Sequence, residues 1–193
     1  MTSPIRTPRL VLRDHVRDDW EAIHRITSDP AVSRFMNWGP NTPEDTTRFL
    51  DAVLASAAEV PRHDHNWAVA LAADGRLVGN CVLRVHDPAQ ETAFIGYALD
   101  RAVWGHGFGT EVAVGLLDFG FAVLGLRRIV ASCDARNLAS ARVLEKAGLR
   151  HEGRLLQERF QKGEWRDTLL FAILRDEWRG HSPPDATRRE AAG

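Results

Sequence analysis

The sequence predicts an α+β fold, in which a mixed, mostly antiparallel central sheet is flanked by helices in a single domain. The chain has 193 residues, of which 44% are hydrophobic and 26% charged, the balance of an ordinary folded domain. Apolar residues alternate through the middle of the chain, which is typical of strands. They then recur at spacings of three and four, which is typical of helices.

The first third of the chain predicts one strand and two helices. Residues 9–13 form the strand, and Asp18 or Asp19 caps the helix that follows it. Thr42, with Asp45 three residues later, is the signature of a second helix that extends to about residue 58.

Strands dominate the middle of the chain, and helices and strands alternate after it. The predicted strands are residues 67–71, 77–85, 91–99, 128–133, 149–160 and 166–174. A helix from Gly107 carries one apolar stripe formed by Val112, Leu116, Phe119 and Val123, and a further helix runs from Asn137 to Gly148. We assign residues 1–179 to the domain and expect 180–193 to be a disordered tail.

Charge and hydropathy exclude several classes of partner. The formal net charge is −1, so nothing attracts the whole chain to nucleic acid or to a membrane surface. No apolar run approaches the roughly 20 residues of a membrane span, and no secretory signal pattern is present. We therefore expect a cytoplasmic protein.

Several chemically notable residues have ordinary structural interpretations. We expect Cys81 and Cys133 to be buried free thiols. His63-Asp64-His65 is interpreted as a solvated loop beside the acceptor rather than as a metal site, and no metal is expected. Trp20, Trp67 and Trp165 are expected in the core, whereas Trp38 lies in a Gly/Pro loop and is a candidate for contact with substrate.

A glycine-rich turn lies between a predicted strand and a predicted helix. Gly105, Gly107 and Gly109 let backbone N–H groups approach a ligand, and the following helix adds its positive N-terminal end. The segment lacks the Gly-Lys-Ser/Thr of a P-loop and the G-x-G-x-x-G spacing of a dinucleotide site. By itself the turn predicts an anion site of unspecified ligand.

The run Gly96-Tyr97-Ala98-Leu99, followed by the segment 104–111, resembles the coenzyme-binding motif of the GCN5-related N-acetyltransferases (GNAT). Trp104 and several other segments resemble the RimJ/RimL branch of that superfamily, and the resemblance covers about residues 7–178. The other segments are 7–13, 137–140 with 144–149, 152–153, and 163–167 leading to 174–178.

The resemblance implies an acetyl-CoA-dependent N-acetyltransferase in which the amine attacks the thioester directly. The strand at 91–99 would then pair with the pantetheine arm and splay from the strand at 128–133, with main-chain N–H groups near Tyr97 polarising the acyl carbonyl. The implied coenzyme-binding residues are Tyr97, Ala98, Leu99, Trp104, Gly105, His106, Gly107, Phe108, Gly109, Thr110, Asn137 and Ser140.

The resemblance also implies the catalytic residues. Ser140 would donate to the coenzyme sulfur, with Tyr97 as the rival acid; the structural alternative makes Asn137 a helix cap and Ser140 a residue of the first turn. Glu158 is a candidate base, although its register is one residue off and Arg159 is the alternative occupant of that position. Glu91, Glu152 or a water relay could replace it.

The acceptor is an amine that the sequence does not identify: a protein N-terminus or a small molecule. Trp38 and Glu91 are the candidate acceptor-binding residues, and the loops at 35–42, 61–66 and 161–164 would set specificity. Dimers are common in the family that the chain resembles, so the resemblance is compatible with a homodimer. Two alternatives stay open: a non-catalytic acyl-CoA-binding protein, and a redox or nucleotide enzyme that uses the glycine turn.

Overall fold

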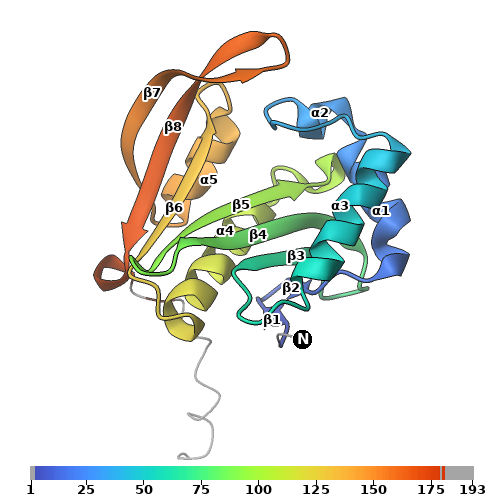
Figure 1. The fold of residues 1–193 in the computed structure, drawn as a ribbon, viewed down its shortest axis with the longest axis horizontal. Helices are drawn as coiled ribbons and strands as arrows, with labels where there is room; N and C mark the ends of the chain where they lie inside the picture. The colour runs from blue at the N-terminus through green and yellow to red at the C-terminus, as the bar shows by residue number, and fades with distance from the viewer. Residues whose placement is uncertain (1–2, 179, 181–193) are drawn as a thin grey trace, which may run out of the picture.

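One eight-stranded sheet organises the molecule (Figure 1). The computed structural model describes residues 3–178 and residue 180. All neighbouring strands are antiparallel except β5 and β6, which are parallel, so the predicted fold class is confirmed. In sheet order the strands are β1 (Ile5–Arg6), β2 (Leu10–Arg13), β3 (Asp64–Leu71), β4 (Leu77–Asp87), β5 (Thr92–Leu99), β6 (Arg128–Asp134), β8 (Glu164–Leu174) and β7 (Arg150–Gln161).

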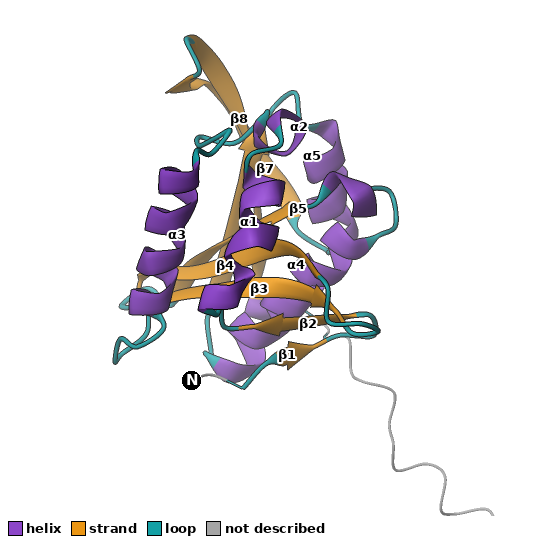
Figure 2. Ribbon diagram, turned by 90° about the vertical axis from the view of Figure 1, so that its right-hand side faces the viewer, coloured by secondary structure: helices purple, strands orange, loops and turns teal. Residues whose placement is uncertain are grey.

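Helices cover both faces of the sheet (Figure 2). The apolar residues of α1 (Trp20–Thr27) and α3 (Pro43–Ser56) form one cluster, which includes Ala98 of β5. Those of α4 (Phe108–Asp118) and α5 (Leu138–Lys146) belong to a larger cluster on the other face. The short helix α2 (Pro30–Ser33) and strand β1 were not predicted.

Local capping explains where two of the helices begin. The Asp45 N–H donates to Thr42 Oγ1 at 3.2 Å and the Thr42 N–H donates to Asp45 Oδ2 at 3.0 Å, which confirms the predicted start of α3. Asn137 Oδ1 likewise accepts from the Ser140 N–H at 3.1 Å at the start of α5. Asp19 precedes α1, but its carboxylate binds Arg13 and the Val16 N–H instead of capping the helix.

The apolar stripe predicted after Gly107 is interrupted at its end. Val112 and Leu116 are fully buried, but Val123 is 66% exposed. The cause is a π-helical turn over Phe119–Val123, whose wider winding rotates Val123 away from the stripe. The prediction for Val123 was therefore wrong.

Three further expectations need correction or fall outside the structure. His65 is not in a loop: it lies on β3, buried and stacked on Trp67 at 5.4 Å. Burial lowers its pKa to about 4. Trp165 is 59% exposed, so it is not a core residue. The predicted disordered tail lies outside the described residues except at residue 180.

No helix in residues 3–178 is long and apolar enough to cross a membrane.

β5 and β6 are paired over only three residues. The pairs are Thr92 with Arg128, Ala93 with Ile129 and Phe94 with Val130. Beyond them the two strands diverge, as Figure 1 shows. β4 continues to pair with β5 as far as Leu99, and β8 with β6 as far as Asp134, so each diverging strand keeps one partner. The sheet therefore contains a wedge-shaped opening, as predicted.

Gly79 lets β4 approach β5 beside this opening. A Cβ atom at residue 79 would lie 2.4 Å from the Ala98 carbonyl oxygen, so we expect Gly79→Ala to destabilise the fold by about 3 kcal/mol. The control is Gly153→Ala, because a Cβ there meets nothing within 4 Å and should change stability by about 0.5 kcal/mol or less. Urea unfolding of both variants measures this, and equal midpoints would contradict the prediction.

Candidate functional site

The opening between β5 and β6 holds a cavity of about 530 Å³. Its walls come from β4, β5, β6, β7, β8, α5 and the loop after α2. Of the predicted site residues, the lining includes Trp38, Tyr97, Ala98, Asn137 and Ser140. Segments distant in the sequence therefore meet at the place where the resemblance locates the thioester.

Strand alternation divides the cavity into two sides. Tyr97 and Cys133 pack with the cluster that includes α4 and α5. Their neighbours Gly96 and Asp134 belong to the opposite face of the sheet, because successive side chains on a strand point in opposite directions. We call these the α4/α5 side and the α1/α3 side of the cavity.

The edge of β5 that faces the opening carries unpaired backbone groups. The Asp100 N–H donates to the Val78 carbonyl at 2.8 Å, toward β4. Because antiparallel hydrogen bonds alternate, the N–H groups of Tyr97 and Leu99 point the other way, into the opening. The Leu99 carbonyl accepts from Trp104 Nε1 at 2.9 Å. Trp104 therefore fastens the glycine turn to the end of β5.

Two hydroxyl groups meet on the α4/α5 side. The Tyr97 and Ser140 hydroxyl oxygens lie 3.2 Å apart. Burial raises the pKa of Tyr97 to about 12, so the phenol keeps its proton at neutral pH. Burial likewise raises the pKa of Cys133 to about 11, which leaves this half-buried thiol protonated. The Tyr97–Ser140 pair can therefore donate hydrogen bonds. Because both groups are neutral hydroxyls, neither is a strong base.

The glycine turn has the geometry of an anion-binding helix start. Gly107 lies at the N-cap of α4 with φ of +81°, a left-handed conformation that favours glycine. A Cβ at Gly109 would lie 3.3 Å from Val143, so glycine allows α5 to approach closely. The first N–H groups of a helix lack intrahelical partners, and these features fit a diphosphate group.

Arg9 holds the turn in place, although the sequence analysis assigned it no role. Arg9 Nη1 donates to the His106 carbonyl at 2.9 Å, and Arg9 Nε donates to Glu111 at 2.7 Å. Its guanidinium group also lies 4.3 Å from the centre of the Phe108 ring. His106 Nδ1 contacts the Trp104 carbonyl at 2.8 Å, so this ring is engaged within its own loop.

The structure does not bring the three candidate glutamates into the cavity lining. Glu91 precedes β5 at its paired end and forms an ion pair with Arg175 at 3.3 Å. Glu158 lies outside the lining, whereas its neighbour Arg159 is part of it. Burial would raise the pKa of Glu158, but hydrogen bonds from Thr168 and Arg159 outweigh it and hold the pKa below its ordinary value. Glu152 is held by Arg128 and Arg150, also outside the lining.

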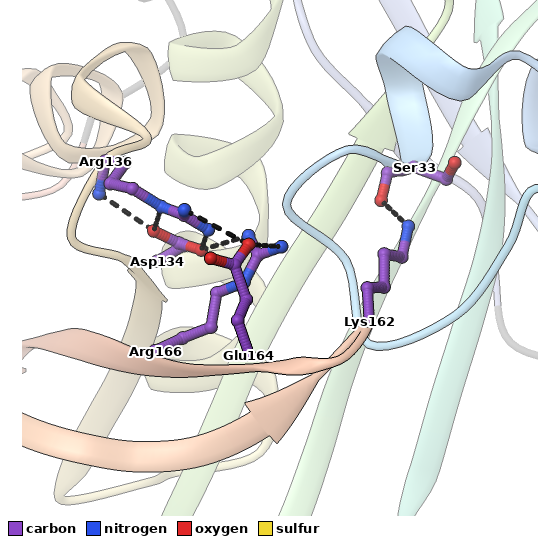
Figure 3. A network of polar contacts seen from close by, with 6 residues as sticks. All are labelled: Ser33, Asp134, Arg136, Lys162, Glu164 and Arg166. Atoms are coloured by element: carbon purple, nitrogen blue, oxygen red, sulfur yellow. Dashed lines mark hydrogen bonds and ion pairs between the residues drawn. The ribbon is translucent and has the colours of Figure 1, made fainter.

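A network of charged residues that the sequence analysis did not identify borders the α1/α3 side (Figure 3). Asp134 Oδ2 accepts from Arg166 at 2.8 Å and from Arg136 at 3.0 Å, and Arg166 also contacts Glu164 at 2.7 Å. Arg166 and Glu164 belong to the hairpin formed by β7 and β8. At the tip of this hairpin, Lys162 Nζ donates to the Ser33 carbonyl at 2.6 Å. This contact joins the β7–β8 hairpin to α2 across the cavity. Within residues 3–178 no cluster of side chains could hold a metal ion.

Comparison with known proteins identifies the class. The protein-family model of the acetyltransferase (GNAT) domain matches residues 9–150 of the sequence. The uncharacterised N-acetyltransferase YnaD of Bacillus subtilis is 33% identical over 175 residues, which cover 90% of this chain and 98% of that protein. The crystal structure of a GNAT-family acetyltransferase from Bacillus anthracis is 32% identical and has a TM-score of 0.80. The match covers 90% of this chain and 99% of that one.

A third comparison concerns the fold alone. Spermidine N-acetyltransferase from Vibrio cholerae, solved in complex with CoA and spermine, has a TM-score of 0.77 at 20% identity, covering 89% of this chain and 98% of that one. The fold, the site and the comparisons together define an acetyl-CoA-dependent N-acetyltransferase. The chain belongs to the GNAT family.

The glycine turn gives a direct test of coenzyme binding. Gly107→Glu places a carboxylate at the start of α4, where repulsion of a diphosphate amounts to about 4 kcal/mol at close range. We expect CoA affinity to fall more than about 100-fold, as measured by calorimetric titration. Gly107→Ala is the control, because it brings the backbone strain without the charge. Unchanged CoA affinity in Gly107→Glu would refute the assignment.

Proposed function

We propose that this enzyme transfers the acetyl group of acetyl-CoA directly to the primary amine of a protein N-terminus or small molecule, in the manner of the RimJ/RimL branch. The observation that carries the proposal is the opening between β5 and β6 with the Tyr97–Ser140 hydroxyl pair beside it. The segments 7–13 and 137–140, which resemble that branch, contribute Arg9 to the glycine turn and Ser140 to the cavity.

The residues suited to hold the coenzyme lie along one path. The turn from Trp104 to Thr110 would bind the diphosphate, and the open edge of β5 from Tyr97 to Leu99 would hydrogen-bond the pantetheine arm together with Asn137. Bound acetyl-CoA supplies a thioester whose carbonyl carbon can be attacked by an amine. The unpaired N–H groups of β5 would stabilise the negative charge that develops on the carbonyl oxygen.

The hydroxyl pair would act on the leaving group. Ser140 would donate a hydrogen bond to the departing sulfur, which finally takes up the proton that the amine loses, and Tyr97, which stays protonated because of its raised pKa, would hydrogen-bond the Ser140 hydroxyl. Asn137 remains the cap of α5 in this scheme, so the structural and functional interpretations of the Asn-x-x-Ser motif are compatible.

The attacking amine must lose a proton, and the cavity favours amines that lose it readily. Glu158 remains a candidate base only through a bridging water, since it lies outside the lining and has a lowered pKa. Without a strong base the fraction of neutral amine decides the rate. An α-amino group with a pKa near 8 has about 250-fold more of its neutral form at neutral pH than a lysine side chain. This supports an α-amine as the acceptor.

Ser140→Ala tests the proposed chemistry. Because the cap of α5 uses the backbone N–H of residue 140, we expect the helix and CoA affinity to be retained, while kcat falls roughly 100-fold. Release of CoA thiol, with peptides as acceptors, measures kcat, and calorimetry measures affinity. Ser56→Ala, on α3 and outside the cavity lining, is the matched control. An unchanged kcat would return Ser140 to a structural role.

A further inference from the structure

We propose that the acceptor carries a carboxylate within a few bonds of its reactive amine, and that Arg159 binds this carboxylate. The inference rests on the proposed function and specifies its substrate class. It starts from the charged residues that line the cavity: Arg84, Asp134, Arg159, Arg166 and Asp167.

Both carboxylates in the lining already have cationic partners. Asp134 is buried and accepts from Arg136 and Arg166. Asp167 accepts from Arg154 Nε at 2.8 Å through one oxygen and from the Gln157 N–H at 2.8 Å through the other. A cationic tail, such as that of a polyamine, would find no free carboxylate in this lining. A net charge near zero could still include a local acidic site, but the lining of this cavity does not form one.

Arg159 is in the opposite situation. Its Nε donates to Glu158 at 2.6 Å, and neither terminal nitrogen has a hydrogen-bond partner among residues 3–178. Both terminal nitrogens of Arg166, in contrast, are engaged by Asp134 and Glu164. A guanidinium group with free terminal N–H groups is suited to the two oxygens of a carboxylate.

The pairing of the hairpin supplies a second observation. Arg159 lies directly opposite Arg166 across β7 and β8. Like charges in directly opposed positions destabilise a sheet. Glu158 and Asp134 offset part of this repulsion, and an anion at the free end of Arg159 would offset more.

The position of Arg159 distinguishes this anion from the coenzyme. Directly opposed residues share a face of the sheet, and Arg166 contacts Asp134 on the α1/α3 side. The hydroxyl pair lies on the α4/α5 side, and the diphosphate would lie at the start of α4. Arg159 therefore faces the acceptor, together with Trp38 from the loop after α2 and Phe94 from β5.

The kinetic experiment compares acceptors that differ only in one carboxylate. Two peptides with Asp or Asn as the first residue, and aspartate α-amide against asparagine α-amide, separate a peptide source from a small-molecule source; spermidine is the cationic comparison. We expect kcat/KM to favour the carboxylate form of at least one pair by about 10-fold or more, in line with a charge-assisted hydrogen bond. Preference for spermidine or for the neutral forms would overturn the proposal.

Arg159→Gln should remove the preference. We expect kcat/KM for the acidic acceptor to fall about 10- to 100-fold, mainly through KM, while the neutral acceptor changes little. Arg150→Gln is the matched control, since Arg150 lies on the same strand but outside the lining. Equal losses for both acceptors in Arg159→Gln would overturn the role of this residue.

A binding measurement separates this proposal from the proposed function. Calorimetry in the presence of CoA compares the α-amides of N-acetylaspartate and N-acetylasparagine as dead-end ligands, because only the first of these carries a carboxylate. Tighter binding of the N-acetylaspartate α-amide that is lost in Arg159→Gln supports the carboxylate site, even if no acceptor releases thiol. Equal binding of the two overturns it, while turnover of neutral amines would leave the acetyltransferase function intact.

Discussion

The early end of the pairing between β5 and β6 is the constraint on which the rest of the molecule depends. Each strand keeps its antiparallel neighbour, β4 or β8, so the sheet stays continuous while one edge of β5 loses its partner. Buried N–H and C=O groups without partners are costly. Here Trp104 satisfies the Leu99 carbonyl, and the N–H groups of Tyr97 and Leu99 remain for a ligand.

The opening connects two chemically different surfaces because a strand presents alternate residues to opposite faces. The α4/α5 side carries protonated hydroxyl and thiol groups and the start of a helix, which suits a thioester with a diphosphate tail. The α1/α3 side carries arginines, and the carboxylate of Asp134 on this side is already paired with one of them, Arg166. The donor and the acceptor would therefore meet from opposite sides of the sheet.

Contacts between distant segments fix this geometry. Arg9, just before β2, binds both the glycine turn and Glu111 of α4, so the start of the chain supports the proposed diphosphate site. Lys162, at the tip of the last hairpin, reaches Ser33 on the other side of the cavity. The proposed acceptor side is thus formed by the loop after α2 and the β7–β8 hairpin, and the loops at 35–42 and 161–164 in these regions contain no motif that identifies the acceptor.

Features set by neighbouring residues could be predicted from the sequence alone. The Thr42–Asp45 capping box, the Asn137 cap and the glycine turn each depend on a few consecutive residues, and strand and helix periods gave the order of the elements. The resemblance of the glycine turn and of the segment at Asn137 predicted where the coenzyme would bind. Tertiary structure decided the rest: the π-helical turn that exposes Val123, the burial of His65, and the choice of Arg159 rather than Glu158 for the cavity. The register shift between Leu155 and Arg159 places Glu158 in the irregular part of β7, where Thr168 and Arg159 hold its carboxylate, a contact that no local pattern in the sequence reveals.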